Sequence, residues 1–144
     1  MILPTRTIED IRALDPCYDP SRYVSEDWSG TALDVLRHKQ CPDTDKLWLV
    51  LREGWIDDKT LRLFAVWCAR QAIALIDNPD LRSIVAIDTA EAFARGEATK
   101  EELAAAEDAA RDAARAAART AARTAAWDAQ CQKLIEMISK EEQA

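Results

Sequence analysis

The sequence has little of what builds phosphate-binding loops or membrane spans. Its 144 residues include only three glycines, Gly30, Gly54 and Gly96, and each stands alone. A phosphate-binding loop needs clustered glycines, so none is expected. No apolar run approaches eighteen residues, and the N-terminus lacks the pattern of a secretory leader. We therefore expect neither a membrane span nor a signal peptide.

Reactive side chains are also scarce. The four cysteines stand far apart without a C-x-x-C pair, which is typical of a reduced, cytosolic protein. The single histidine, His38, forms an H-x-x-C pair with Cys41. A metal site would need two further ligands from distant segments. A nucleophilic Cys-His pair is not indicated either, because Cys41 lies just before Pro42 near an expected helix end. We expect no metal, no cofactor and no catalytic residue, and we interpret the protein as a binding protein rather than an enzyme.

Positive charge is in short supply. The chain has 26 acidic residues against 19 lysines and arginines, for a net charge of −7. Proteins that bind nucleic acid need cations to neutralise phosphates, so direct nucleic-acid binding is not expected. A basic protein partner is compatible with this charge, and so is a purely solubilising role.

What the sequence has in abundance is helix signals. Thr7 can cap a first short helix, and Thr31 with Asp34 can cap a second. Pro42 and Asp43 can start a third, with Gly54 as its stop. Residues 15–30 carry two prolines, a glycine and three aromatic residues, so they are expected to form an irregular loop. No strand pattern is found.

Two longer helices are expected next, over residues 58–76 and 79–95. Asp57 can cap the first, whose apolar residues cover most of its circumference, and such a helix is normally buried. Asn78 and Pro79 are the expected cap and first residue of the second. Five tryptophans indicate a packed interior.

Residues 104–129 contain fifteen alanines, the residue with the highest helix propensity. Thr99 and Glu102 form a capping box ahead of them, and no glycine or proline follows. A helix over residues 99–140 is therefore expected. Arginines four residues apart, from Arg111 to Arg123, share a charged face with acids, which we interpret as facing solvent. The smooth alanine face would pack on the earlier helices, or alternatively form an interface with a partner helix.

These features predict a single all-α domain over residues 1–144. We expect a compact bundle of five or six helices, with short helices in residues 1–54, central helices in 57–95 and a long alanine-rich helix over 99–140.

Candidate partner-binding residues are the acids that cluster along the sequence, together with one tryptophan. Trp28 lies in the irregular loop beside two acids, and tryptophan is a common anchor of protein interfaces. Most of the other acids lie at expected helix N-termini, where a carboxylate is favourable for structural reasons alone. The candidates are Glu26, Asp27, Trp28, Asp57, Asp58, Glu101, Glu102, Glu107 and Asp108.

Two resemblances bear on function. The segments LRLFAVWCARQAI (61–73) and AIDTAEAFARGEATKEELAAA (86–106), with the alanine run that ends at Trp127, are similar to small all-helical immunity proteins of bacteria and phages. The whole chain resembles phage-encoded anti-CRISPR proteins that inhibit the type I-C system. Neither resemblance brings catalytic residues with it.

The second resemblance implies inhibition of a type I-C CRISPR-Cas effector complex by stoichiometric binding. Its partners would be protein subunits of the Cascade-type complex in the cytoplasm of a bacterial host, and we expect a monomer that blocks target DNA by mimicking its charge. The alternative is an immunity protein that neutralises a bacterial toxin by stoichiometric binding. An enzyme that uses Cys41 and His38 is the third hypothesis.

Overall fold

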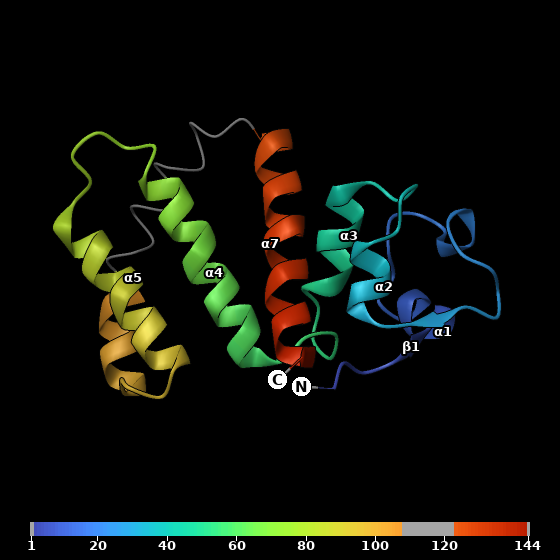
Figure 1. Ribbon diagram of the computed structural model, residues 1–144, viewed down its shortest axis with the longest axis horizontal. Coiled ribbons are helices and arrows are strands. Elements are labelled where there is room, and N and C mark those ends of the chain that lie inside the picture. The colour runs from blue at the N-terminus through green and yellow to red at the C-terminus, as the bar shows by residue number, and fades with distance from the viewer. Residues whose placement is uncertain (1, 108–122, 144) are drawn as a thin grey trace. The chain divides into compact units, whose positions relative to one another are not determined.

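The computed structural model describes residues 2–107 and 123–143 (Figure 1). The fold is mostly helical, which confirms the predicted fold class. The chain divides into two compact units: unit 1 combines Met1–Asp57 with Trp127–Ala144, and unit 2 covers Asp58–Ala126. Unit 1 therefore brings the two ends of the chain together.

Unit 1 begins with a strand and a helix that share one threonine. Strand β1 (Arg6–Thr7) pairs antiparallel with β2 (Ser29–Gly30), with Arg6 opposite Gly30. Thr7 also caps α1 (Ile8–Arg12): its hydroxyl accepts from the backbone N–H of Asp10, whose carboxylate accepts from the N–H of Thr7. The cap was predicted. The two strands were not, because a strand of two residues is too short to show an alternating apolar pattern in the sequence.

The next elements of unit 1 are short. A single 3-10 turn, η1 (Pro20–Arg22), lies in the irregular loop and is capped by Asp19. Helix α2 (Ala32–Leu36) has the predicted reciprocal cap between Thr31 and Asp34. Helix α3 (Asp43–Val50) begins after Pro42 as predicted, but it ends before Gly54, which takes a left-handed conformation with φ of 87°.

Helix α7 (Arg123–Gln143) completes unit 1 from the other end of the chain. Residues of α7 that recur every three or four positions are buried, as expected for one face of a helix; they are Cys131, Leu134 and Ile138. The core of unit 1 also holds the buried side chains of Ile8 and Trp55. Its hydrophobic core is thus made by segments that are far apart in the sequence.

Unit 2 contains α4 (Asp58–Ile73) and α5 (Leu81–Ala94). Arg70 of α4 donates to Asp88 at 3.0 Å and also pairs with Glu91 of α5. Arg62 lies over the ring of Phe93, 5.0 Å from its centroid. These contacts join α4 to α5 through charged and aromatic side chains at the edges of their apolar contact.

Three predictions for unit 2 need correction. The first helix ends at Ile73 rather than at residue 76. It buries only Thr60, Phe64 and Val66, whereas an apolar pattern around most of the circumference predicted more. The second helix is capped by Asp80 rather than by Asn78, because Asn78 adopts a left-handed conformation with φ of 53° and the helix starts after it.

The alanine-rich helix is described in part. The predicted capping box is present: the N–H of Thr99 donates to Glu102 at 2.8 Å, and the N–H of Glu102 donates to the Thr99 hydroxyl at 3.2 Å. Residues 100–107 are helical. The continuity of the helix from residue 99 to 140 and the arginine series from Arg111 to Arg119 lie outside the described residues.

We predict that Asp80 stays ionised to about pH 2. Hydrogen bonds from the side chain and backbone of Arg82 lower its pKa from 3.8 to about 2. Because the folded-state pKa is lowered, the stabilisation is complete above pH 3.8 and is lost as the pH falls through about 2. An NMR titration of the Asp80 carboxyl carbon measures the midpoint.

The matched control for this titration is Asp80→Asn. Asparagine keeps a capping oxygen but does not ionise. The part of the pH dependence of unfolding that comes from Asp80 should therefore vanish in the variant. A midpoint near 3.8 in the native protein would contradict the prediction.

Candidate functional site

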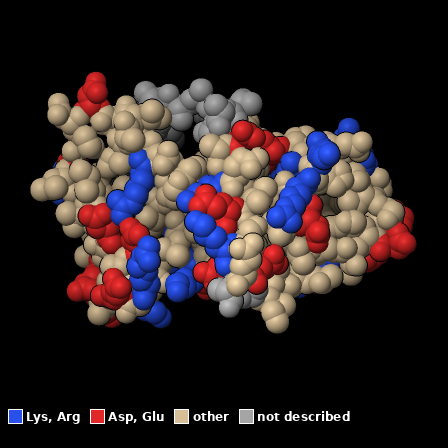
Figure 2. Space-filling model, viewed as in Figure 1, with Lys and Arg blue, Asp and Glu red and all other residues tan. Residues whose placement is uncertain are grey.

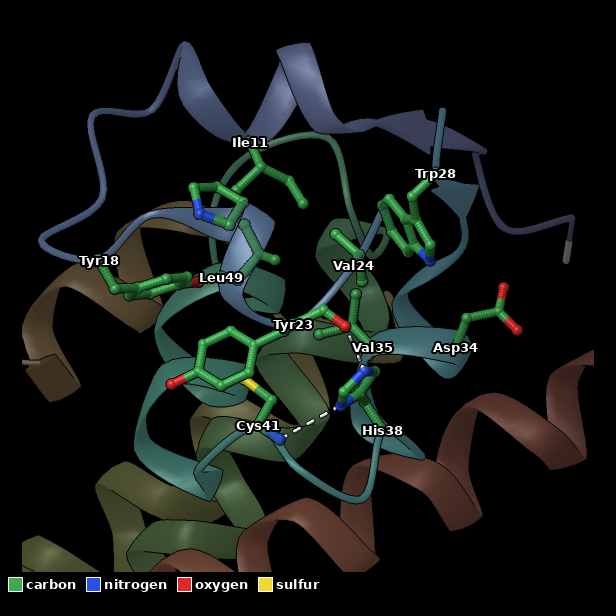
Figure 3. Close-up of a pocket in the computed structure, with 11 residues that line it drawn as sticks. Ile11, Tyr18, Tyr23, Val24, Trp28, Asp34, Val35, His38, Cys41 and Leu49 are labelled. Atoms are coloured by element: carbon green, nitrogen blue, oxygen red, sulfur yellow. Dashed lines mark hydrogen bonds between the residues drawn. The ribbon is translucent and has the colours of Figure 1, made fainter. Parts of the chain in front are cut away.

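The irregular loop and the helices after it form an apolar pocket in unit 1 (Figure 3). In the close-up, the rings of Tyr18 and Tyr23 lie on one side and the indole of Trp28 lies on the other. Ile11, Pro20, Val24, Val35 and Leu49 supply aliphatic lining, and Asp34, His38 and Cys41 complete the set. The pocket has a volume of about 40 Å³.

A bidentate ion pair connects the loop of residues 15–30 to α1. Arg12 donates to both carboxylate oxygens of Glu26, at 2.7 and 2.8 Å. This hydrogen bonding lowers the pKa of Glu26. Asp19, the cap of η1, lies 3.9 Å from the same guanidinium. Bidentate pairs hold their partners in a defined orientation, so Arg12 orients the Glu26 side chain two residues before Trp28.

Trp28 is held by the chain on either side of it. The backbone N–H of Trp28 donates to the carbonyl of Ser25 at 3.0 Å. The Ser25 hydroxyl donates to the carboxylate of Asp27 at 2.6 Å. That second bond is the main reason for the lowered pKa of Asp27. The indole covers Gly30 so closely that a Cβ there would lie 2.5 Å from Cζ2 of the ring. Glycine at position 30 therefore allows the indole to lie at the edge of the pocket.

His38 ties the loop to the segment between α2 and α3. Its Nδ1 accepts from the backbone N–H groups of Gln40 and Cys41, at 3.3 and 3.2 Å. Because Nδ1 is an acceptor, the ring proton is on Nε2, which lies 3.0 Å from the carbonyl of Tyr23 and donates to it. The ring of Tyr23 also meets that of His38 edge-on, with centroids 6.2 Å apart.

Burial favours the uncharged form of two polar groups in the pocket wall, Tyr18 and Cys41. Burial raises the pKa of the Tyr18 hydroxyl well above its usual range. It also raises the pKa of the Cys41 thiol to about 11, so at neutral pH this cysteine is a thiol rather than a nucleophilic thiolate. The rings of Tyr18 and Tyr23 meet edge-on at 5.7 Å, which gives one wall of the pocket a rigid aromatic surface.

The structure brings together only some of the candidate binding residues. Glu26, Asp27 and Trp28 are adjacent in the loop of unit 1, with both acids exposed and the tryptophan half-buried. Asp57 and Asp58 precede and begin α4, and both are exposed.

The remaining candidates belong to unit 2. Glu101, Glu102 and Glu107 are exposed on the helix of residues 100–107, and Glu102 is engaged in its cap. Glu107 borders a hollow between α4 and α5 that Arg62 and Phe93 also line. Asp108 lies outside the described residues.

Sequence reasoning selected Trp28 but missed the pocket that Trp28 borders. The signal available in the sequence was the concentration of aromatic residues within a turn-rich segment, which holds Tyr18, Tyr23 and Trp28. Their convergence depends on contacts with α1, α2 and α3, which the sequence pattern of the loop does not contain.

Charged side chains of both signs are interleaved on the face shown in Figure 2. Several acids are paired there or elsewhere with nearby bases, such as Glu136, which lies 2.8 Å from Lys140. Hydrogen bonding from Lys140 is the main cause of the lowered pKa of Glu136. Paired acids present a weaker field than isolated ones, and this applies to Glu26 of the loop as well, because Arg12 pairs with it.

The described residues hold neither a metal-ligand cluster nor a membrane-spanning helix. In residues 2–107 and 123–143, no group of three or more His, Cys, Asp or Glu side chains is arranged to hold a metal ion. No helix in those same ranges is both long enough and apolar enough to span a membrane. Comparisons of the chain with protein-family models, curated proteins and solved structures gave no match.

Proposed function

We propose that the protein binds and inhibits a type I-C CRISPR-Cas effector complex without performing catalysis. The observation that carries the proposal is the loop of unit 1, where exposed Glu26 and Asp27 directly precede Trp28 at the edge of an apolar pocket. An aromatic anchor with charged neighbours is the usual composition of a protein-binding surface. The resemblance of the whole chain to type I-C inhibitors supplies the identity of the partner.

In this proposal the acids act by occupying the path of target DNA. An effector complex holds DNA in a positively charged channel that contacts the phosphate backbone. Carboxylates on a folded protein can bind the same cations, and a net charge of −7 favours the encounter through long-range attraction. Stoichiometric binding then excludes DNA while the complex itself stays assembled.

We predict that an equimolar amount of the protein abolishes binding of labelled target DNA to the purified type I-C effector complex. Fluorescence anisotropy of the DNA measures the effect. Inhibition should weaken steeply as salt is raised, because exposed charges are screened. If DNA binding is intact at saturating protein, DNA exclusion is wrong, and recruitment of the nuclease is the step to examine next.

Paired charge-neutral variants separate the two groups of candidate acids. Glu26→Gln with Asp27→Asn tests the loop of unit 1, and Glu101→Gln with Glu107→Gln tests the helix of unit 2. The control is Glu142→Gln, which removes one exposed charge near the C-terminus. If only one of the two double variants loses inhibition, the contact is assigned to the unit that carries its substitutions. An equal loss in the control would indicate a response to net charge only.

The apolar pocket also suits the alternative of an immunity protein, because a toxin is a protein partner as well. The two functions differ in what lies beside the gene. A toxin gene supports the immunity protein, and phage structural genes or a regulator of anti-CRISPR operons support the inhibitor. Protection of cells against the neighbouring gene product, with no effect on the effector complex, would replace the first proposal with the second.

A further inference from the structure

The pocket of unit 1 is apolar although it opens beside exposed residues. Its lining includes buried Ile11, Val35 and Leu49 in the interior and exposed Asp34 at the margin (Figure 3). The two ring nitrogens of His38 in its wall are engaged, since both are bound to backbone groups. Water in such a hollow has few hydrogen-bonding partners, so an apolar group displaces it favourably.

The size of the pocket limits what it can take. A cavity needs roughly 10–15 Å³ to hold one group of the size of a water molecule. The volume of about 40 Å³ therefore holds about three such groups. The branched end of a leucine, isoleucine or valine side chain has this size, whereas an aromatic ring has six heavy atoms and is too large.

The surroundings of the pocket are acidic. Residues 11–49, the span that contains every lining residue, carry seven acids and five bases, for a net charge of −2. Asp34 is part of the lining beside Trp28. Asp45 is near the opposite wall, where its charge helps to raise the pKa values of Tyr18 and Cys41. A segment that enters the pocket is thus favoured when it carries basic residues around its apolar one.

We propose that this pocket binds one branched aliphatic side chain, leucine, isoleucine or valine, from a segment of the protein partner that is flanked by lysine or arginine. The identity of the partner rests on the function proposed above, but the chemistry of the bound segment follows from the pocket alone. Trp28 is the wall that closes over the aliphatic group, and Asp34 receives a flanking cation.

The first test uses the full-length protein and a short peptide as the probe. The peptide is acetylated and has leucine between two pairs of lysines. It should shift the indole N–H signal of Trp28 in ¹⁵N spectra, with the signal assigned from Trp28→Phe. Two matched peptides, one with alanine in place of leucine and one with glutamate in place of lysine, should leave the signal unchanged.

Each outcome of this titration has a defined meaning. Equal shifts from the leucine and alanine peptides would overturn the aliphatic site, and equal shifts from the lysine and glutamate peptides would overturn the role of charge. A shift that depends on protein concentration without peptide would assign the pocket to a second copy of this chain, which also overturns the proposal.

The second test measures affinity for the purified type I-C effector complex by biolayer interferometry. Val24→Phe fills the pocket, and Gly30→Ala moves the indole, because its Cβ would lie 2.5 Å from Cζ2 of Trp28. Each change should raise the Kd by at least about 30-fold, as for an interface hot spot. The control is Gln132→Ala, an exposed position on α7, which should leave the Kd within a factor of two.

The two tests separate failure of this inference from failure of the proposed function. If the native protein does not bind the effector complex but the leucine peptide shifts Trp28, the function is wrong and the pocket stands. If the complex binds and both pocket variants retain native affinity, the function stands and the pocket is overturned. Two variants are used so that overpacking in Val24→Phe alone does not decide the result.

Discussion

Replacing Leu134 with alanine is expected to destabilise unit 1 by about 2–5 kcal/mol. Leu134 is fully buried on α7, with a relative exposure of 0%. Ile138, one turn further along the same helix, is equally buried. A truncated leucine at such a site loses its transfer free energy and leaves a cavity as well, and both losses add to the destabilisation.

The effect should be large because α7 holds together the two ends of the chain. Unit 1 consists of residues 1–57 and 127–144, so the buried face of α7 packs in a core whose other members come from residues 1–57. Most of those members lie on α1, α2 and α3, which are too short to be stable as isolated helices. Their stability depends on tertiary packing, and α7 provides the longest helix of the unit.

Urea unfolding followed by far-UV circular dichroism measures the change in the free energy of unfolding. Gln132→Ala serves as the matched control, because it lies on the exposed face of the same helix and should change stability by less than about 0.5 kcal/mol. Ile138→Ala should behave like Leu134→Ala. A change below about 0.5 kcal/mol in both core variants would mean that α7 does not contribute to the core.

Local features of the fold could be predicted from sequence where the interacting groups are close in the chain. The capping pairs at Thr31 with Asp34 and at Thr99 with Glu102 are confirmed, because each joins residues three positions apart. The cap of α5 was predicted two residues early. Asn78 and Asp80 are both good capping residues, and only the backbone conformation decides between them.

Long-range features could not be predicted in the same way. Arg70 pairs with acids 18 and 21 residues away, and His38 bonds to a carbonyl 15 residues away. Such contacts depend on how helices pack. The apolar pattern of one helix shows which face is buried but does not identify the helix that packs against it. The pocket is missed for the same reason, since its lining residues come from α1, the loop, α2 and α3.

The composition of the loop that carries three candidate residues could be predicted because charge and aromatic content are local properties. Glu26, Asp27 and Trp28 are exposed or half-buried in one loop, as the turn-rich sequence suggests. What the sequence did not contain is that Glu26 is held by Arg12 and that Trp28 lies over Gly30. These contacts set the orientation of both side chains.

Replacing Gly54 with alanine is the second change for which a large loss of stability is expected. Gly54 has φ of 87°, a conformation that costs a residue with a Cβ about 1–2 kcal/mol. Its carbonyl accepts from Nε of Arg6 at 3.0 Å and from Nη2 of the same guanidinium. An added Cβ would overlap Nη2, so the alanine variant should also lose a charged hydrogen bond of about 1.5–3 kcal/mol.

A double-mutant cycle separates the two causes. Arg6→Ala loses the hydrogen bonds but keeps the glycine, and in the double variant no guanidinium remains for the new Cβ to displace. Adding Gly54→Ala to Arg6→Ala should therefore cost only the backbone strain, about 1–2 kcal/mol. Gly96→Ala checks that value independently, because Gly96 has φ of 80° and no atom lies within 4 Å of its Cβ position. If Gly54→Ala lowers the free energy of unfolding equally with and without Arg6, the guanidinium does not stabilise the contact between β1 and the segment after α3. Backbone strain alone then explains the loss.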